Sequence, residues 1–258
     1  MLTNILDAIG TRLLVALDKV GDFALLSYRA IRAVFRRPFD GAGLLHQLSV
    51  VGINSLPVIL LTSLAVSMVF AVQLSFGFKQ FQAEGMAAQV EGLAIVRELS
   101  PIITGLMMSG RVGSAMAAEL GTMRVTEQID ALECLATDPI QYLFVPRLLA
   151  AAIMVPLLTG ISILVGYWGG YMLLVSTEGQ SSAVYADEFF KLLSMGDAGI
   201  ALAKGIMFGL IIALIGCWRG YRTMGGAEGV GNAPTSSVVL SSLWILISDF
   251  FLTKLLLV

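Results

Sequence analysis

The chain has 258 residues, of which 57% are hydrophobic and 13% are charged, and its formal net charge is −2. This composition excludes an ordinary soluble domain and places the chain among membrane proteins. The length suits one bundle of spans, and we expect no nucleic acid among its partners.

The first 37 residues predict an amphipathic helix. Their polar residues recur at intervals of three, four and seven, which places them on one stripe of a helix, and the remaining faces are apolar. We expect residues 1–37 to lie in the cytoplasmic interface of a membrane, with Pro38 ending the helix. An ordinary amphipathic packing helix is the alternative, which is less favoured because the chain has no soluble domain for it to pack on. A signal peptide is not expected, because the segment has no uninterrupted apolar run and no small-residue cleavage site.

Residues 38–258 predict a single transmembrane domain of five helices. Residues 41–78 and 148–177 contain no Asp, Glu, Lys or Arg, and each stretch exceeds the ~20 residues that cross the hydrocarbon core. An odd number of spans places the loops that are rich in Lys and Arg on one side, which the positive-inside rule makes cytoplasmic. The expected spans are about 48–78, 89–118, 148–177, 199–218 and 235–258, with the N-terminus in the cytoplasm.

An apolar stripe is predicted at the outer end of the first span. It consists of Phe70, Leu74, Phe78 and Phe81, which a continuous helix would place on one face. Such a stripe is more often core or lipid-facing surface. In a lipid transporter, it would be a suitable wall for acyl chains.

The second span carries two adjacent charges, Arg97 and Glu98, followed by Leu99. Charges inside a membrane are costly unless they are paired or face a wet cavity, so they indicate either a functional site or a structural ion pair. Neighbouring residues on one helix do not face each other. We therefore expect other partners for this pair, such as Lys204, Asp249 or a lipid headgroup.

A polar island, residues 111–147, separates the second and third spans. Within it, about 119–138, the sequence predicts a short amphipathic helix on the cytoplasmic face, with Thr126 as its N-cap and a stop before Pro139. This geometry would let a membrane subunit exchange force with a docked motor domain. A helix that only caps the bundle is the alternative. The candidate coupling residues are Glu119, Arg124, Glu127, Gln128, Asp130, Glu133 and Asp138.

The sequence offers little for catalysis. A single histidine and two cysteines exclude the usual zinc sites, and no GxxxxGK[ST] phosphate loop occurs. We therefore expect no enzyme, no metal site and no cofactor on this chain, so that any ATP and Mg²⁺ would be bound by a partner. Cys134 and Cys217 fall on the predicted cytoplasmic side, where a disulfide is not expected.

Glycines four residues apart indicate close helix packing. Packing within the chain is the simpler interpretation and a dimer seam is the alternative. The pairs are Gly166 and Gly170, Gly205 and Gly209, and Gly216 and Gly220.

Several short motifs are spread over nearly the whole chain. They are Arg97-Glu98-Leu99, Gly110-Arg111-Val112-Gly113, Glu119-Leu120-Gly121, Met123, Thr126-Glu127-Gln128, Asp130-Ala131-Leu132, Asp138-Pro139, Pro146-Arg147, Gly225-Gly226-Ala227-Glu228-Gly229-Val230-Gly231 and Asp249-Phe250. At this spacing they resemble the signature of the MlaE/YrbE permeases, the membrane subunits of Mce-type phospholipid ABC transporters.

The resemblance implies an MlaE-type fold in the inner membrane and a homodimer with phospholipid as its cargo. It also implies cytoplasmic ABC ATPase subunits that grip the coupling helix, a periplasmic MCE-domain protein, and a small cytoplasmic STAS-like subunit. The residues alone leave two other classes open. One is an ion- or proton-coupled carrier using Glu98, Lys204 and Asp249, and the other is a scaffold that transports nothing.

Overall fold

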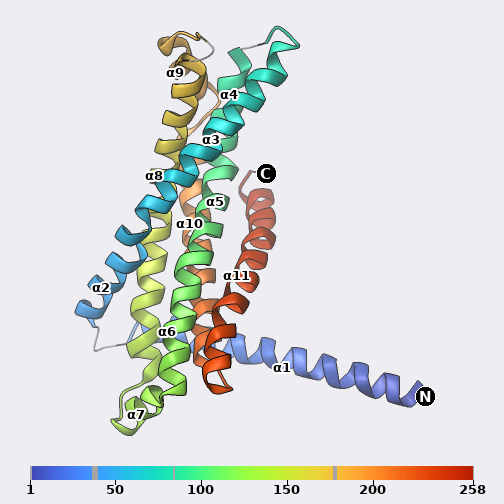
Figure 1. Cartoon of the computed structure of the whole chain (residues 1–258), viewed down its shortest axis with the longest axis vertical. Helices are drawn as coiled ribbons and strands as arrows, with labels where there is room; N and C mark the ends of the chain where they lie inside the picture. The colour runs from blue at the N-terminus through green and yellow to red at the C-terminus, as the bar shows by residue number, and fades with distance from the viewer. Residues whose placement is uncertain (1, 37–39, 84, 177–178, 258) are drawn as a thin grey trace.

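The computed structural model describes residues 2–36, 40–83, 85–176 and 179–257. Over these residues every regular element is a helix, which confirms the all-α fold class (Figure 1). In chain order, the elements are α1 (Leu2–Val34), α2 (Gly41–Val51), η1 (Ile53–Ser55), α3 (Leu56–Lys79), α4 (Gly85–Ala94), η2 (Ile95–Leu99), α5 (Ser100–Met108), η3 (Ser109–Gly113), α6 (Ser114–Val125), α7 (Gln128–Cys134), η4 (Ile140–Phe144), α8 (Val145–Ser176), α9 (Ser182–Lys191), α10 (Met195–Tyr221) and α11 (Gly226–Leu257).

Five helical runs are long and apolar enough to cross a membrane, as the sequence predicts. They are Gly41–Lys79, Gly85–Val125, Ile140–Ser176, Met195–Tyr221 and Gly226–Leu256. Most of them extend beyond the ranges expected from hydropathy. The second run is the clearest case, because its helix continues for seven residues past 118. Hydropathy marks where the chain leaves hydrocarbon, whereas the backbone hydrogen bonds of a helix continue into water.

The N-terminal helix α1 projects sideways from the end of the bundle that also carries α7 (Figure 1). Among the side chains of α1 that the structure describes, those buried against the bundle are Leu26, Ala30 and Ala33, all in its C-terminal half. Farther toward the N-terminus, Leu13 and Leu17 are more than half exposed. Pro38, the expected end of this helix, lies outside the described residues, and α1 ends at Val34.

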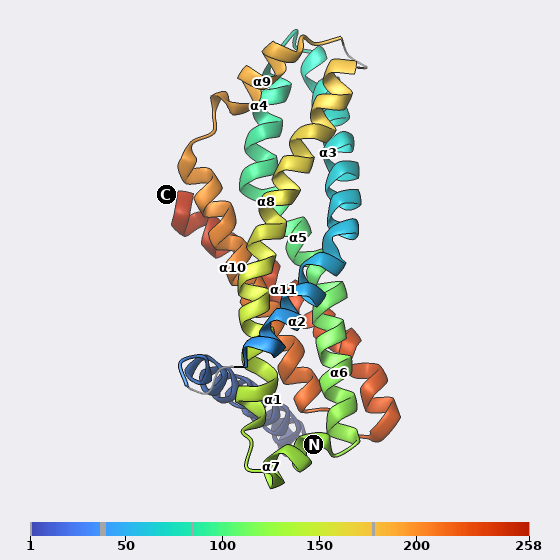
Figure 2. The ribbon, with the colours of Figure 1, turned by 90° about the vertical axis from the view of Figure 1, so that its left-hand side faces the viewer.

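The second view shows the bundle as a long, narrow stack with α7 at one end and the turn into α9 at the other (Figure 2).

Small residues allow the helices of the bundle to approach closely. A Cβ built on Gly209 of α10 would lie 2.5 Å from the carbonyl oxygen of Ala151 in α8, and one on Gly216 would lie 2.9 Å from that of Gly113. These glycines therefore pack helices within the chain, in agreement with the simpler interpretation of their spacing.

Among the described residues, the π-helical segments η2 and η3 interrupt the second helical run, and η4 begins the third. A π turn inserts one extra residue into a helix and changes the direction of the side chains around it, and such turns are frequent at functional sites. η2 contains both Arg97 and Glu98. This irregularity, which hydropathy cannot detect, sets the direction of the two charged side chains.

Candidate functional site

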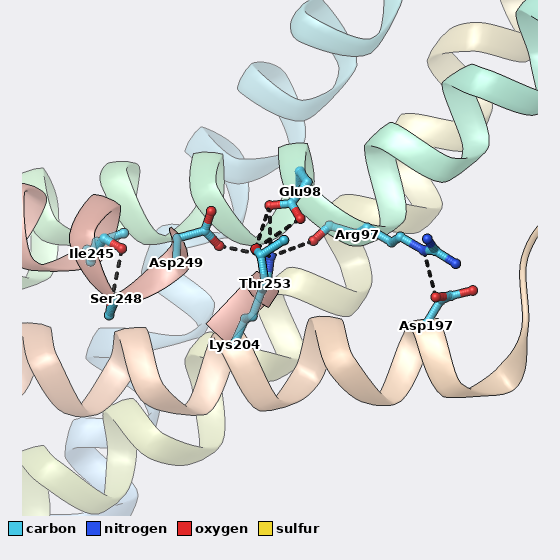
Figure 3. A network of polar contacts seen from close by, with 8 residues as sticks. All are labelled: Arg97, Glu98, Asp197, Lys204, Ile245, Ser248, Asp249 and Thr253. Carbon is cyan, nitrogen blue, oxygen red and sulfur yellow. Dashed lines mark hydrogen bonds and ion pairs between the residues drawn. The ribbon is translucent and has the colours of Figure 1, made fainter. Parts of the chain in front are cut away.

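Lys204 is the centre of a buried polar cluster (Figure 3). Its side chain has no exposed surface, and its Nζ lies 2.8 Å from Glu98 Oε2, 2.8 Å from Thr253 Oγ1 and 3.0 Å from the carbonyl oxygen of Arg97. Asp249 Oδ1 lies 2.9 Å from the same nitrogen. We call Glu98, Lys204, Asp249 and Thr253 the Lys204 cluster.

The hydrogen bonds of the Lys204 cluster can be counted. An ammonium group has three protons, and these are directed at Glu98, Thr253 and the Arg97 carbonyl. Asp249 therefore shares the positive charge without a well-directed hydrogen bond of its own. Thr253 also donates to Glu98, with 3.1 Å between Oγ1 and Oε1. Two carboxylates thus depend on one cation, which joins the second, fourth and fifth spans.

Arg97 points away from the Lys204 cluster toward the first turn of α10. Its Nε donates to Asp197 Oδ1 at 2.7 Å, and the Asp197 side chain is 3% exposed (Figure 3). Asp197 also accepts from the backbone nitrogen and the hydroxyl of Ser194, which forms a capping box. Of the partners expected from the sequence, Lys204 contacts Glu98 directly and Asp249 is joined through Lys204, whereas the partner of Arg97 is Asp197.

The predicted apolar stripe is shorter than expected. Phe70, Leu74 and Phe78 lie on one face of α3 and are half-buried, but α3 ends at Lys79. Phe81 follows in a turn and is 78% exposed, so its place on the stripe was wrong. The prediction assumed that the helix continued, and the turn breaks its periodicity.

The stripe and the charged pair make no polar contact with each other. Within the described residues, the polar side-chain contacts of Arg97 and Glu98 go to α10 and α11 and not to α3. Leu99 lines a small cavity of about 10 Å³ between α3, α5 and α8. Leu99 therefore lies next to α3, whereas the charged ends of Arg97 and Glu98 are directed at α10 and α11.

The predicted coupling helix, 119–138, is two elements. Glu119 and Arg124 belong to α6, the continuation of the second span, and only Gln128–Cys134 forms a separate helix, α7. Thr126 does not cap α7, because its hydroxyl donates to the Thr122 carbonyl instead. Glu127 takes the N-cap position with φ +59°, and this left-handed residue turns the chain between the two helices.

Two of the candidate coupling residues hold α7 against the bundle. Asp130 Oδ1 lies 2.6 Å from Arg124 Nη1 in α6, and Tyr221 Oη donates to Glu133 Oε1 at 3.5 Å. Glu127 is exposed at the tip of the connection. The segment therefore has a fixed base and a free outer surface.

The remaining coupling candidates lie around the base of α7. Glu119 Oε2 accepts from Arg147 Nη2 at 2.7 Å, which joins α6 to α8. Asp138 Oδ1 accepts from the backbone nitrogen of Ile140 at 3.0 Å, and Asp138 also lies near Arg36, which follows the end of α1. Gln128 is exposed beside Glu127.

Three residues with polar contacts inside the bundle were not predicted from the sequence. Asp197 could have been found from the Ser194-x-x-Asp197 spacing of a capping box, and Thr253 had no distinguishing signal. Glu91 in α4 is fully buried, accepts from the Tyr185 hydroxyl at 3.3 Å, and leaves Oε1 without a hydrogen-bond partner among the described residues. A buried carboxyl without a cation is expensive, and its tertiary neighbours could not be inferred from spacing.

No group of three or more His, Cys, Asp or Glu side chains in the described part of the chain could hold a metal ion. Cys134 is exposed and Cys217 is buried, and both are free thiols.

Five apolar spans joined by buried ion pairs define a multi-pass membrane protein of the all-α class. The chain belongs to the MlaE permease family, whose model matches residues 44–255. A probable ABC transporter permease protein of Rickettsia conorii is 44% identical over 99% of this chain and 98% of its own length.

Two further relatives extend the comparison beyond Rickettsia. A probable ABC transporter permease protein of Synechocystis is 44% identical over 82% of this chain and 80% of its own length. The chloroplastic protein TRIGALACTOSYLDIACYLGLYCEROL 1 of Arabidopsis thaliana is 43% identical over 81% of this chain and 60% of its own.

Proposed function

We propose that this chain is the membrane-spanning subunit of an ABC transporter that moves phospholipids between an inner and an outer membrane. ATP would be hydrolysed, with Mg²⁺, on separate cytoplasmic subunits. The family match over residues 44–255 carries the proposal, because it assigns the transporter class to almost the whole chain. The Arabidopsis relative is named after a galactolipid, which supports a lipid as the cargo. An ion-coupled carrier and a scaffold are disfavoured by the same match.

The shape of α7 supports docking of an ATPase. Its base packs on the bundle through the fully buried side chain of Ile129, beside the Arg124–Asp130 ion pair, while Glu127 and Gln128 are exposed. A helix with a fixed base can transmit a push to the spans that it joins. We therefore assign the direct ATPase contact to Glu127 and Gln128, and assign to Glu119, Arg124, Asp130, Glu133 and Asp138 the role of holding the coupling segment in place.

The proposal includes a homodimer in the inner membrane with the α1 and α7 end in the cytoplasm. Arginines gather at that end, on α1, α6, α8 and α10, as the positive-inside rule requires. Only 17% of the most apolar window of α11 is buried within the chain, against 56% for α10. A second copy could therefore cover part of α11, while an MCE-domain protein would dock at the opposite end and a STAS-like subunit at the cytoplasmic end.

Phospholipid would enter along the half-buried face of α3, with Phe70, Leu74 and Phe78 as its acyl wall. Arg97 is 28% exposed although it is paired with Asp197, so part of its charge remains available to a headgroup. Glu98 and Leu99 lie one turn or less from Arg97, and Phe81 lies beyond the end of the wall.

Transport of a fluorescent phospholipid between vesicles, with the ATPase partner reconstituted, tests the wall. Leu74→Arg should abolish transport, since an arginine there would project into the path of an acyl chain. Phe76→Arg is the matched control, because Phe76 lies two residues along the same helix on another face and is 72% exposed. If Leu74→Arg assembles and transports normally, the α3 wall is wrong. If only Phe76→Arg blocks transport, the wall lies on the other face.

A further inference from the structure

A cavity of about 470 Å³ lies between α1, α10 and α11, at the end of the bundle that carries α7. Its walls are mostly apolar and include Phe23, Ile215, Leu240 and Trp244. Two basic side chains, Lys19 and Arg219, belong to the same lining. The cavity is therefore amphiphilic and has the size of a small-molecule site.

Arg219 has unused capacity for an anion. Its Nε is buried without a hydrogen-bond partner, and its guanidinium lies 5.4 Å from the centre of the Trp218 ring. Among the described residues, neither Arg219 nor Lys19 has a carboxylate within ion-pair distance. Asp22, one turn beyond Lys19, is already bound by Arg222 and Trp218.

We propose that this cavity binds one anionic phospholipid, with its phosphate against Arg219 and Lys19 and an acyl chain along Phe23, Leu240 and Trp244. A guanidinium matches a phosphate through two parallel hydrogen bonds, and the apolar wall beside it excludes a free inorganic anion as the preferred occupant. Tryptophan suits the boundary between headgroup and acyl chain.

The site is distinct from the acyl wall on α3, which runs toward the other end of the bundle (Figure 1). It requires only that the chain lies in a membrane, and it does not depend on transport. α1 packs on α8, α10 and η4, whereas the cavity separates it from α11. A bound lipid would therefore join α1 to the last span.

The three tryptophans of the chain provide a direct probe. Trp218 and Trp244 line the cavity, so a Trp168→Phe background reports on this site alone. Phosphatidylglycerol with brominated acyl chains, added to the protein in detergent micelles, should quench the fluorescence to saturation at one lipid per chain. Brominated phosphatidylcholine should require a concentration about tenfold higher, because it lacks the net charge that Arg219 and Lys19 recognise.

Removal of both charges tests the assignment. Lys19→Gln with Arg219→Gln should abolish the preference for phosphatidylglycerol, whereas Arg29→Gln with Arg32→Gln should preserve it. The control pair removes the same number of positive charges as the test pair. Both of its arginines are in α1 and lie outside the cavity. Ser236→Phe fills the cavity and keeps both charges, so it should abolish saturable quenching. This variant tests the binding site independently if Lys19→Gln with Arg219→Gln fails to fold.

Equal quenching by the two lipids in the unsubstituted protein would overturn the proposal, as would a preference that survives Lys19→Gln with Arg219→Gln. Quenching that develops only after dilution would mean that a second copy covers the cavity, and this too would overturn the proposal. The assay contains no ATPase, so these results do not bear on the proposed transport function. A loss of vesicle-to-vesicle transport would likewise leave the quenching result unaffected.

Discussion

At the scale of single residues, the Lys204 cluster is the most constrained feature of the molecule. A fully buried ammonium is stable only because two carboxylates, a hydroxyl and a carbonyl surround it. Breaking a buried pair by removing one partner is more costly than replacing the whole set, because the remaining charge is left unpaired. Removal of the cation alone should therefore destabilise the protein much more than neutralisation of the whole set.

Lys204→Met should destabilise the protein by up to about 3–5 kcal/mol, since Glu98 and the mostly buried Asp249 would then repel each other without a shared cation. Lys204→Met combined with Glu98→Gln and Asp249→Asn should recover most of that loss. Thermal unfolding in detergent micelles measures both variants. A triple variant that is less stable than Lys204→Met alone would show that the charges do not act as one set.

At the scale of elements, α1 depends on a small number of contacts near its middle. Asp22 accepts from Trp218 Nε1 at 2.9 Å and from the Arg222 guanidinium, and Phe23 packs edge-on against Trp218 at 5.4 Å between ring centres. Partial burial acts to raise the pKa of Asp22, but the hydrogen bonds from Arg222 and Trp218 outweigh it and hold the pKa below 3.8. The ionised carboxylate is thus the form that anchors α1.

Asp22→Ala should loosen α1 without unfolding the spans. Hydrogen exchange over residues 13–34 should become faster, while exchange in α8 and α10 should stay unchanged. A carboxyl whose pKa is lowered on folding contributes its stabilisation above its ordinary pKa, and the contribution is lost as the pH falls through the folded value. The unsubstituted protein should therefore keep α1 protected from neutral pH down to about 4. Rapid exchange in α1 already at pH 6 would contradict the anchor.

The second element with a test of its own is α7. Glu127→Lys with Gln128→Lys should abolish co-purification of the ATPase while leaving the permease folded, because exposed charges contribute little to stability. Asp187→Lys, an exposed acidic position on α9 at the other end of the bundle, is the control and should retain the ATPase. Wild-type recovery of the ATPase with the α7 variant would refute the proposed contact.

At the scale of the whole molecule, five spans place the two ends of the bundle on opposite sides of the membrane. The turn between α8 and α9 and the turn between α10 and α11 lie at opposite ends (Figure 2). The proposed orientation puts the first outside and the second in the cytoplasm, because Arg219 and Arg222 precede the second turn.

Single cysteines test this orientation in a background that lacks Cys134 and Cys217. Asp187→Cys should react with an impermeant maleimide added to intact cells whose outer membrane admits it, and Met224→Cys should react only after lysis. Both positions are exposed, and Met224 is 82% exposed, so burial cannot account for a difference. Equal labelling of the two positions in intact cells would exclude a five-span topology.

The sequence by itself determined the class of protein, the number of spans and the location of the polar island. Each of these follows from hydrophobicity and charge along the chain, because hydrocarbon requires long apolar helices whatever their neighbours are. The family signature could also be recognised from the sequence, because it consists of short local motifs. The adjacency of Arg97 and Glu98 also indicated that they do not pair with each other.

Only the tertiary structure decided which partners those are. Asp197 and Thr253 lie about 100 and 155 positions along the chain from Arg97 and Glu98, and no local pattern encodes such contacts. The remaining differences from the predictions lie where helix periodicity breaks. They are the π turn at η2, the turn that removes Phe81 from the α3 face, and the division of the predicted coupling helix into α6 and α7. Hydropathy records which residues tolerate hydrocarbon, whereas the position of each break depends on the helices packed against it.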